Sequence, residues 1–311
     1  MSIYITLDGG TTNTRLTLVK DGCAEDRISL GVGVQKNIGE KGILEEKIKQ
    51  GIETLLLKNS ISDGDVSAII ASGMVTSEFG LCNLPHVTAP AGLSELHSTI
   101  ERRALPEISS IPFAFIRGVK RESSDMADFD VMRGEETELS GIYSPEYGEA
   151  IYVLPGSHSK IIKTDALGRI TDFSTMLTGE MIKSLAENTI LKGAIELSEA
   201  KIVDEYLLRG YDFTANEGIN KALFKVRVLK NFFGATGDEA YSFFIGAVLC
   251  GELREIIENG TKTVVIGGRR QLRFAMGQIL EQRSDKRVIL LDDNTVDLST
   301  AVGAVRIFEG K

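Results

Sequence analysis

The stretch 7–15, LDGGTTNTR, constrains this chain more than any other part of the sequence. It lies between two apolar segments that predict strands, 3–7 and 16–19. Glycines at the turn let backbone N–H groups approach a ligand that a Cβ atom would exclude, and successive N–H groups form an anion-binding concavity. Threonine hydroxyls add donors, and Asp8 is placed to meet a cation that accompanies the anion. The stretch therefore indicates a phosphate-binding hairpin, although an ordinary glycine-rich β-turn has the same local signature.

Composition restricts the partners of such a hairpin. The chain has 311 residues, which suits two domains better than one core, and its net charge is −9. This charge argues against nucleic acid or an anionic membrane as the main partner, and it requires local neutralisation of any bound phosphate. The three cysteines form no Cys-x-x-Cys pair, no apolar signal core precedes the first strand, and no apolar run is long enough to span a bilayer. We therefore expect a cytoplasmic protein without zinc fingers.

Strand and helix patterns alternate along the chain, which predicts an α/β fold with ligands beyond the carboxyl ends of the strands. A second strand–turn–strand unit, with the tip PGSHSK at 155–160, repeats the first hairpin in kind. Two hairpins of this type indicate two related domains. The other elements expected from periodicity are strands over 27–32, 66–71, 111–116, 263–266 and 287–291, and helices over 43–57, 93–105, from 131–139 onward, through most of 180–259, and over 299–308.

The sequence has neither a G-x-x-x-x-G-K-[ST] motif nor a G-x-G-x-x-G after its first strand, which disfavours a P-loop enzyme and a Rossmann dehydrogenase. Instead, LDGGTTNTR, LPGSHSK, VVIGG and small-residue helices, in this order, resemble the sugar kinase/actin/Hsp70 ATPase superfamily. More specifically, VMRGEETEL, LPGSHSK, DFSTMLTGE and ASGMVTSEFG are similar to the 2-dehydro-3-deoxygalactonokinase family. The succession of RGEET, PGSHSK and TGE is the most specific part of this resemblance.

The resemblance implies two ribonuclease-H-like (actin-like ATPase) domains around an interdomain cleft. The N-terminal domain, 1–130, would bind the sugar acid, and the C-terminal domain, 131–311, would bind the nucleotide, with the C-terminal helix at the hinge. The implied reaction uses ATP and Mg²⁺ to phosphorylate the terminal hydroxyl of 2-dehydro-3-deoxy-D-galactonate, giving the 6-phosphate and ADP in galactonate catabolism. Alternatives are a kinase for another small sugar or sugar acid such as 2-dehydro-3-deoxygluconate, and a non-catalytic ATP-binding actin-like switch. The sugar epimer, a homodimer and the extent of domain closure stay open.

The resemblance also implies residue roles. Asp8 would organise Mg²⁺ through water, and Glu135 would be the general base, with Glu136 as the alternative. The aspartates Asp125, Asp128 and Asp130 are weaker candidates for the base. The residues expected to contact ATP and its phosphates are Gly9, Gly10, Thr11, Thr12, Asn13, Gly156, Ser157, His158, Gly179, Glu180, Gly267 and Gly268. Those expected on the substrate side are Arg15, Arg133, Met74 and Val75.

Structural explanations compete with two of these roles, because acidic residues in a first turn also complement the helix dipole and His158 also fits a purely structural hydrogen bond. The chain departs from the family pattern in two places. Gly9 stands where family members often carry tryptophan. Arg269 and Arg270 follow Gly268 where small residues are usual, so they would either line the adenine pocket or point to solvent, and nucleotide preference stays open.

Overall fold

The computed structural model describes residues 2–40, 42–195 and 200–311. Its internal contacts divide the chain into two compact units. The first comprises Met1–Gly148, Thr164–Asp172 and Asn294–Lys311, and the second comprises Glu149–Lys163 and Phe173–Asp293. Residues 131–148 and most of the C-terminal helix thus pack with the first unit. The expected assignment of residues 1–130 to the sugar acid and of residues 131–311 to the nucleotide stays a prediction.

The first unit is built on a mixed sheet. Its strand order is β3 (Cys23–Leu30), β2 (Thr14–Lys20), β1 (Ile3–Gly9), β4 (Ala68–Gly73), β7 (Phe113–Phe115) and β6 (Glu101–Arg103). The expected hairpin is confirmed, because β1 pairs antiparallel with β2 and parallel with β4. Asp8 pairs with Arg15 on one side and with Ser72 on the other, so these three side chains share one face of the sheet.

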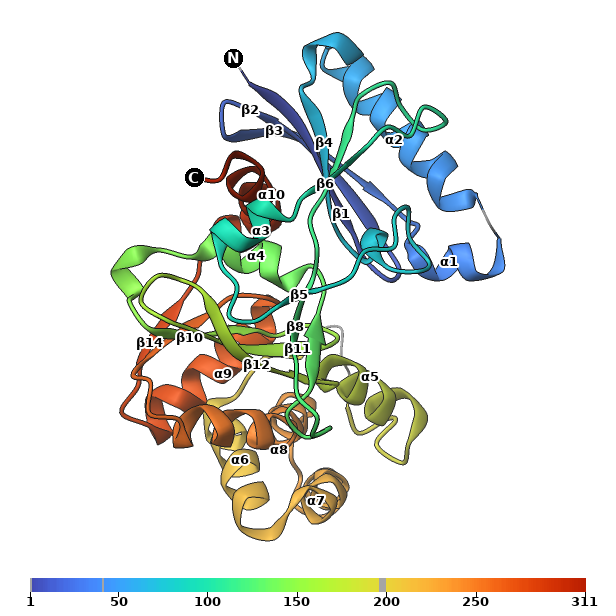
Figure 1. Ribbon diagram of the computed structural model, residues 1–311. Helices are drawn as coiled ribbons and strands as arrows, with labels where there is room; N and C mark the ends of the chain where they lie inside the picture. The colour runs from blue at the N-terminus through green and yellow to red at the C-terminus, as the bar shows by residue number, and fades with distance from the viewer. Residues whose placement is uncertain (1, 41, 196–199) are drawn as a thin grey trace. The chain divides into compact units, whose positions relative to one another are not determined.

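Helices cover both faces of this sheet (Figure 1). Helix α2 (Ile43–Lys58) buries an apolar stripe that includes Leu44, Ile48 and Leu55 in the same core as β1 and β2. Helix α10 (Asp293–Glu309) lies on the opposite face, where the ring of Phe308 packs edge-on against Tyr4 with 5.3 Å between centroids. Two short helices, α1 (Val34–Gly39) and α3 (Leu93–Ser98), complete the periphery.

Helices α10 and α4 (Glu135–Ile142) approach each other through glycine. A Cβ atom at Gly141 would lie 1.8 Å from the carbonyl oxygen of Ser299, and one at Gly303 would lie 1.8 Å from the carbonyl oxygen of Thr137. Only glycine fits at either position, so these two glycines set the distance between the helices.

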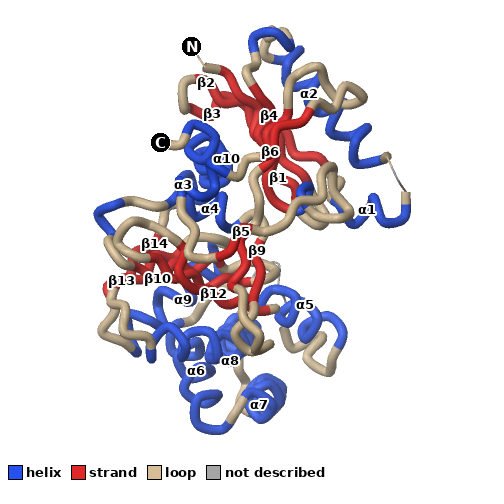
Figure 2. Tube along the Cα trace, viewed as in Figure 1, coloured by secondary structure: helices blue, strands red, loops and turns tan. Residues whose placement is uncertain are grey.

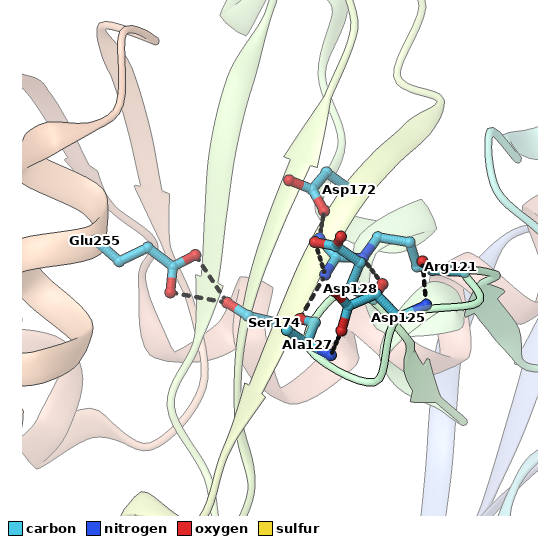
Figure 3. A network of polar contacts seen from close by, with 8 residues as sticks. Arg121, Asp125, Ala127, Asp128, Asp172, Ser174 and Glu255 are labelled. Carbon is cyan, nitrogen blue, oxygen red and sulfur yellow. Dashed lines mark hydrogen bonds and ion pairs between the residues drawn. The ribbon is translucent and has the colours of Figure 1, made fainter.

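A small sheet, ordered β5 (Val87–Thr88), β8 (Val119–Arg121) and β9 (Asp130–Met132), also belongs to the first unit. Figure 3 shows how Arg121 fastens the β8–β9 connection, because its guanidinium bonds the Asp172 carboxylate and the carbonyl oxygens of Ala127 and Asp128. Arg121 Nη2 also lies 3.5 Å from the Asp128 carboxylate. Asp128, a weak candidate for the general base, is therefore paired within this connection.

Two local expectations were wrong. The helix expected over 93–105 ends at Ser98, because the segment Glu101–Arg103 instead pairs antiparallel with β7. The helix expected to start at 131 begins at Glu135, because Asp130–Met132 forms β9 and Gly134 turns the chain with φ +113°. In both cases pairing with the neighbouring strand along the chain overrides the local helical pattern.

The second unit repeats the strand order of the first. Its sheet runs β12 (Ile170–Met176), β11 (Ser159–Thr164), β10 (Ala150–Leu154), β13 (Thr263–Ile266) and β14 (Arg287–Leu290), with β13 parallel to both β10 and β14. The hairpin β10–β11 thus takes the place of β1–β2, and β13 takes the place of β4. The two related domains expected from the two hairpins are confirmed at the level of strand order.

The helices of the second unit are α5 (Thr178–Asn188), α6 (Asp204–Glu217), α7 (Ile219–Phe232), α8 (Gly237–Glu258) and α9 (Arg270–Arg283). Helices α6, α8 and α9 lie together beside the sheet (Figure 2) and bury a common apolar core with β10 and β13. Most of the expected helical stretch after residue 180 is confirmed, and residues 196–199 of it lie outside the described residues. Three short 3₁₀ turns, Asp63–Asp65, Met74–Thr76 and Pro145–Tyr147, complete the regular structure.

Candidate active site

The tip of the first hairpin is supported from behind by helix α1. Within the tip, the N–H of Gly10 donates to the carbonyl oxygen of Asn13 at 2.8 Å. The N–H groups of Val34 and Gln35, at the start of α1, donate to the carbonyl oxygens of Gly10 and Thr11. The residues 11–13 are exposed. A fixed turn with exposed small polar residues is the arrangement that phosphate binding requires.

Three glycines bring separate segments together beside this hairpin. A Cβ atom at Gly9 would lie 2.2 Å from Cγ1 of Val75, and one at Gly73, where φ is +78°, would lie 2.5 Å from the carbonyl oxygen of Gly9. One at Gly134 would lie 3.3 Å from the Cα atom of Gly73. The ends of β1 and β4 and the start of α4 therefore meet at van der Waals distance. Val75 fills the space beside Gly9, which explains why this chain has no bulky residue there.

Carboxylates concentrate where these segments meet. The Asp8 side chain is 31% exposed, and its carboxylate lies 3.6 Å from the guanidinium of Arg15. Burial raises the pKa of Asp8, Arg15 opposes that rise, and the charge of Glu135 adds to it. Burial and the charges of Glu135 and Asp8 likewise raise the pKa of Glu138 to about 8. The structure thus brings Asp8 and Glu135 together, and it adds Glu138, which the sequence analysis did not single out.

Glu136 has a different environment from Glu135. Its side chain is fully buried, and its carboxylate accepts the N–H of Gly134 at 2.8 Å and the hydroxyl of Thr137 at 2.9 Å. Burial, with the charge of Glu135, raises the pKa of Glu136 to about 7. These contacts hold the beginning of α4 together. Glu136 thus has a structural task, whereas Glu135, which accepts the N–H of Arg133 at 3.1 Å, is partly exposed.

The guanidinium of Arg133 makes several contacts within the protein. Its Nη1 donates to the carbonyl oxygen of Thr76 at 2.7 Å, and its Nη2 donates to the carbonyl oxygen of Leu84 at 3.0 Å. Nη2 also lies 3.2 Å from Nε2 of His86. Arg133 thereby ties the segment 76–86 to the start of α4. Since Val75 precedes Thr76 and packs on Gly9, this contact also helps to fix the first hairpin.

His86 provides a test of this arrangement through pH. Burial and the charges of Arg133 and Lys120 lower its pKa from an ordinary 6.5 to about 4. Between these two pKa values the unfolded chain therefore binds more protons than the folded chain. We expect the contribution of neutral His86 to stability to be fully present above pH 6.5 and to be lost as the pH drops toward 4. The loss at pH 5 attributable to His86 is up to about 2 kcal/mol. Urea unfolding of wild type and His86→Gln at pH 5 and 7 checks this, and parallel pH profiles would contradict it.

In the second unit, the tip of the β10–β11 hairpin contacts the start of α5. The N–H groups of Gly179 and Glu180 both donate to the carbonyl oxygen of Ser157, at 3.0 and 3.2 Å. A Cβ atom at Gly179 would lie 2.3 Å from the carbonyl oxygen of Gly156. Nε2 of His158 lies 2.9 Å from Oε1 of Glu180. The structure therefore brings together the predicted residues of PGSHSK and TGE.

The predicted glycine pair after β13 lies against the same hairpin. The N–H of Gly267 donates to the carbonyl oxygen of Val153 at 2.9 Å. Gly268 has φ +63°, and a Cβ atom there would lie 2.4 Å from the carbonyl oxygen of Pro155. The predicted nucleotide-side residues thus form one group in the second unit, as the hairpin, Asp8 and the α4 glutamates do in the first.

Comparison with protein families adds to this geometry. The model of one family, 2-keto-3-deoxy-galactonokinase, matches residues 8–300, which is nearly the whole chain. The chain belongs to the 2-keto-3-deoxy-galactonokinase family. It is 29% identical to the 2-dehydro-3-deoxygalactonokinase of Escherichia coli (strain K12) over 251 residues, which cover 80% of this chain and 78% of that protein. A relative from Rhizobium meliloti (strain 1021), named for the same activity, is 30% identical over 196 residues, covering 62% of this chain and 59% of its own.

Solved structures agree on the fold of this family member. A crystal structure from Sinorhizobium meliloti, assigned as a 2-dehydro-3-deoxygalactonokinase, superposes with a TM-score of 0.77 at 21% identity, covering 97% of this chain and 96% of that one. The activator of 2-hydroxyisocaproyl-CoA dehydratase from Clostridium difficile, with bound ADPNP, gives a TM-score of 0.51 at 15% identity, covering 99% and 95%. The expected actin-like ATPase fold is confirmed. Among the described residues, no helix combines the length and hydrophobicity that a membrane span requires.

Membership in the 2-keto-3-deoxy-galactonokinase family makes this chain a kinase, a phosphotransferase whose acceptor is an alcohol group. The individual site residues stay predictions, and the structure adds two to them. Glu138 follows Glu135 by three positions, a spacing that places both on one side of a helix, so the sequence carried a signal for it. His86 carried none, because only the fold brings it to Arg133.

Proposed function

We propose that this kinase transfers the γ-phosphoryl group of ATP to the terminal hydroxyl of 2-dehydro-3-deoxy-D-galactonate, giving the 6-phosphate and ADP in galactonate catabolism. The observation that carries the proposal is the grouping of Asp8 and Glu135 beside the first hairpin, with burial and mutual charge acting on Asp8. A carboxylate next to a set of backbone donors suits phosphoryl transfer to a hydroxyl. The choice of substrate is taken from the names of the family and of the relatives.

In the proposed reaction, Glu135 accepts the proton of the sugar-acid hydroxyl as its oxygen bonds to the γ-phosphorus. The bond between that phosphorus and the oxygen bridging to the β-phosphate breaks, and ADP leaves with the electron pair. Residues 9–13 hold the phosphates with backbone and hydroxyl donors. Positioning and charge neutralisation by these groups supply more of the rate than the base does.

The residues near Asp8 fit Mg²⁺ held through water and nucleotide phosphates. Among the described residues, no group of three or more acidic, histidine or cysteine ligands could hold a metal by itself. Asp8 nevertheless offers a partly exposed carboxylate near the charge of Glu135, and among the described residues the buried hydroxyl of Ser72, its neighbour on β4, has no hydrogen-bond partner. One carboxylate with phosphate ligands is the usual Mg²⁺ arrangement in kinases. When bound, Mg²⁺ would neutralise charge on the transferred group.

The substrate carboxylate requires a cation, and we propose Arg15 for this role ahead of Arg133. Arg15 is 56% exposed and, among the described residues, forms one ion pair, with Asp8, at a long 3.6 Å, whereas Arg133 already bonds Thr76 and Leu84. We expect Arg15→Gln to raise the KM for the sugar acid by about 10-fold or more, because a hydrogen bond to a charged group is lost. The KM for ATP should change much less. An unchanged sugar-acid KM would return the role to Arg133.

The function is tested by a coupled assay of ADP release from purified protein, ATP and Mg²⁺. We expect turnover with 2-dehydro-3-deoxy-D-galactonate, and phosphorus–proton correlation spectra should place the new phosphate at the terminal carbon. A panel containing the gluconate epimer and other hydroxylated acids measures the alternative specificity by kcat/KM. Absence of ADP above the acceptor-free background with both epimers would refute the proposal.

A further inference from the structure

The adjacent arginines Arg269 and Arg270, which the sequence could not separate, have different environments in the structure. Nη1 of Arg270 lies 3.3 Å from the Asp293 carboxylate, and its guanidinium carbon lies 5.8 Å from the ring centroid of Phe274. Nη2 of Arg269 instead donates to the hydroxyl of Ser157, at 3.1 Å, in the tip of the second hairpin. One arginine therefore turns toward the predicted phosphate site and the other turns to an acidic partner.

The backbone fixes Arg269 in this position. Its N–H donates to the carbonyl oxygen of Pro155 at 2.8 Å, and the preceding Gly268 packs so closely on Pro155 that no Cβ atom fits. The backbone of Arg269 is thus held by Pro155, and its guanidinium is held by Ser157 in the same hairpin. These two contacts fix both ends of the Arg269 side chain.

The charge of Arg269 has no ion-pair partner in the part of the chain that the structure describes. Among the described residues, no carboxylate lies within ion-pair distance of its exposed guanidinium, whereas the neighbouring Glu180 is engaged by His158 at 2.9 Å. The hydrogen bond to Ser157 uses one of the five N–H donors of the guanidinium. The others remain for a phosphate, which arginine can bind with two parallel hydrogen bonds. In a chain of net charge −9, such a cation is needed locally.

We propose that Arg269 binds the phosphate chain of the nucleotide, together with the hairpin residues 156–158. This rests on the proposed function in taking ATP as the phosphoryl donor, and it adds a cationic residue where the glycine-rich pattern predicts only backbone donors. Arg269 thereby neutralises nucleotide charge from the second unit and orients the phosphates through Ser157.

The test is equilibrium binding of ADP with Mg²⁺ and, separately, of adenosine, measured by calorimetry on the full chain. We expect Arg269→Gln to weaken ADP binding by about 10- to 100-fold and to leave adenosine binding within about twofold, since adenosine has no phosphates. Arg269→Lys should fall between, because it keeps the charge and loses the fork. The matched control is Arg270→Gln, which should bind ADP as wild type does, since Asp293 keeps its contact with Arg273.

Two results would overturn the assignment. One is wild-type ADP affinity in Arg269→Gln, and the other is an equal loss for ADP and adenosine, which would mean that Arg269 only shapes the hairpin. Because binding is read without the sugar acid, a failure of the proposed substrate would leave this test intact. Conversely, turnover of the sugar acid with unchanged ADP affinity in Arg269→Gln would refute the role of Arg269 alone.

Discussion

Replacing Glu135 by glutamine is expected to lower kcat by roughly 100-fold or more while ATP affinity stays nearly intact. The amide can still accept the N–H of Arg133, which lies 3.1 Å from the carboxylate, so the start of α4 should keep its shape. It cannot take a proton from the sugar-acid hydroxyl. Residual turnover is expected because phosphate positioning is untouched. Steady-state assays, with ADP affinity measured on the same protein, check this prediction.

Glu136→Gln is the matched control, because the adjacent carboxylate differs in what it contacts. It accepts hydrogen bonds from Gly134 and Thr137 and is fully buried. We therefore expect Glu136→Gln to lower the free energy of unfolding and to leave kcat of the folded enzyme close to the wild-type value. Near wild-type turnover in Glu135→Gln would remove the base from this residue. If Glu136→Gln or Glu138→Gln then lost turnover instead, that residue would be the general base.

A single methyl group at Gly303 is expected to destabilise the protein by about 3 kcal/mol. The Cβ atom of Gly303→Ala would lie 1.8 Å from the carbonyl oxygen of Thr137 in α4, so the two helices must separate. Separation would expose buried surface and displace the helix that begins with Glu135. We expect the urea midpoint to fall, and we expect kcat to fall with it even where the protein remains folded.

Gly251→Ala is the control for Gly303→Ala, since both glycines lie inside long helices. A Cβ atom at Gly251, in α8, would have no heavy atom within 4 Å. Alanine there should stabilise by about 0.5–1 kcal/mol through helix propensity alone. Equal effects of the two substitutions on the urea midpoint would contradict the packing explanation for Gly303.

Sequence reasoning succeeded where local chemistry decides structure. Both hairpins, the strand before Gly267 and the amphipathic helix over 43–57 are signalled by residues that neighbour one another in the chain, and each is present. The small residues around Gly303 are consistent with the close packing of α10 on α4. The glycine at position 9 is different, because the side chain that leaves no room for a larger residue there, Val75, lies on another element.

Sequence patterns do not decide where the contacts of a side chain depend on the fold. Glu135 and Glu136 are adjacent and chemically alike, and only the fold turns one carboxylate back onto Gly134 while the other stays partly exposed. Arg133 reads as a substrate ligand by its charge, yet its guanidinium bonds Thr76 and Leu84, about 50 residues earlier in the chain, contacts that no local pattern contains. The strand β9 has a different explanation, because its partner β8 is the preceding strand, and the acidic residues after Gly134 made the whole segment resemble a helix start.

The repeated strand order makes the two hairpins comparable position by position. Leu7-Asp8-Gly9 ends β1, whereas Leu154 ends β10 and Pro155-Gly156 follow it, so the two segments can be compared by their sequence. Where one copy has a carboxylate, the other has proline, which offers neither a charge nor a backbone donor. At this position two units of common strand order therefore differ in charge and in backbone donors. Moving the carboxylate from the first hairpin to the second would require Asp8→Pro together with Pro155→Asp.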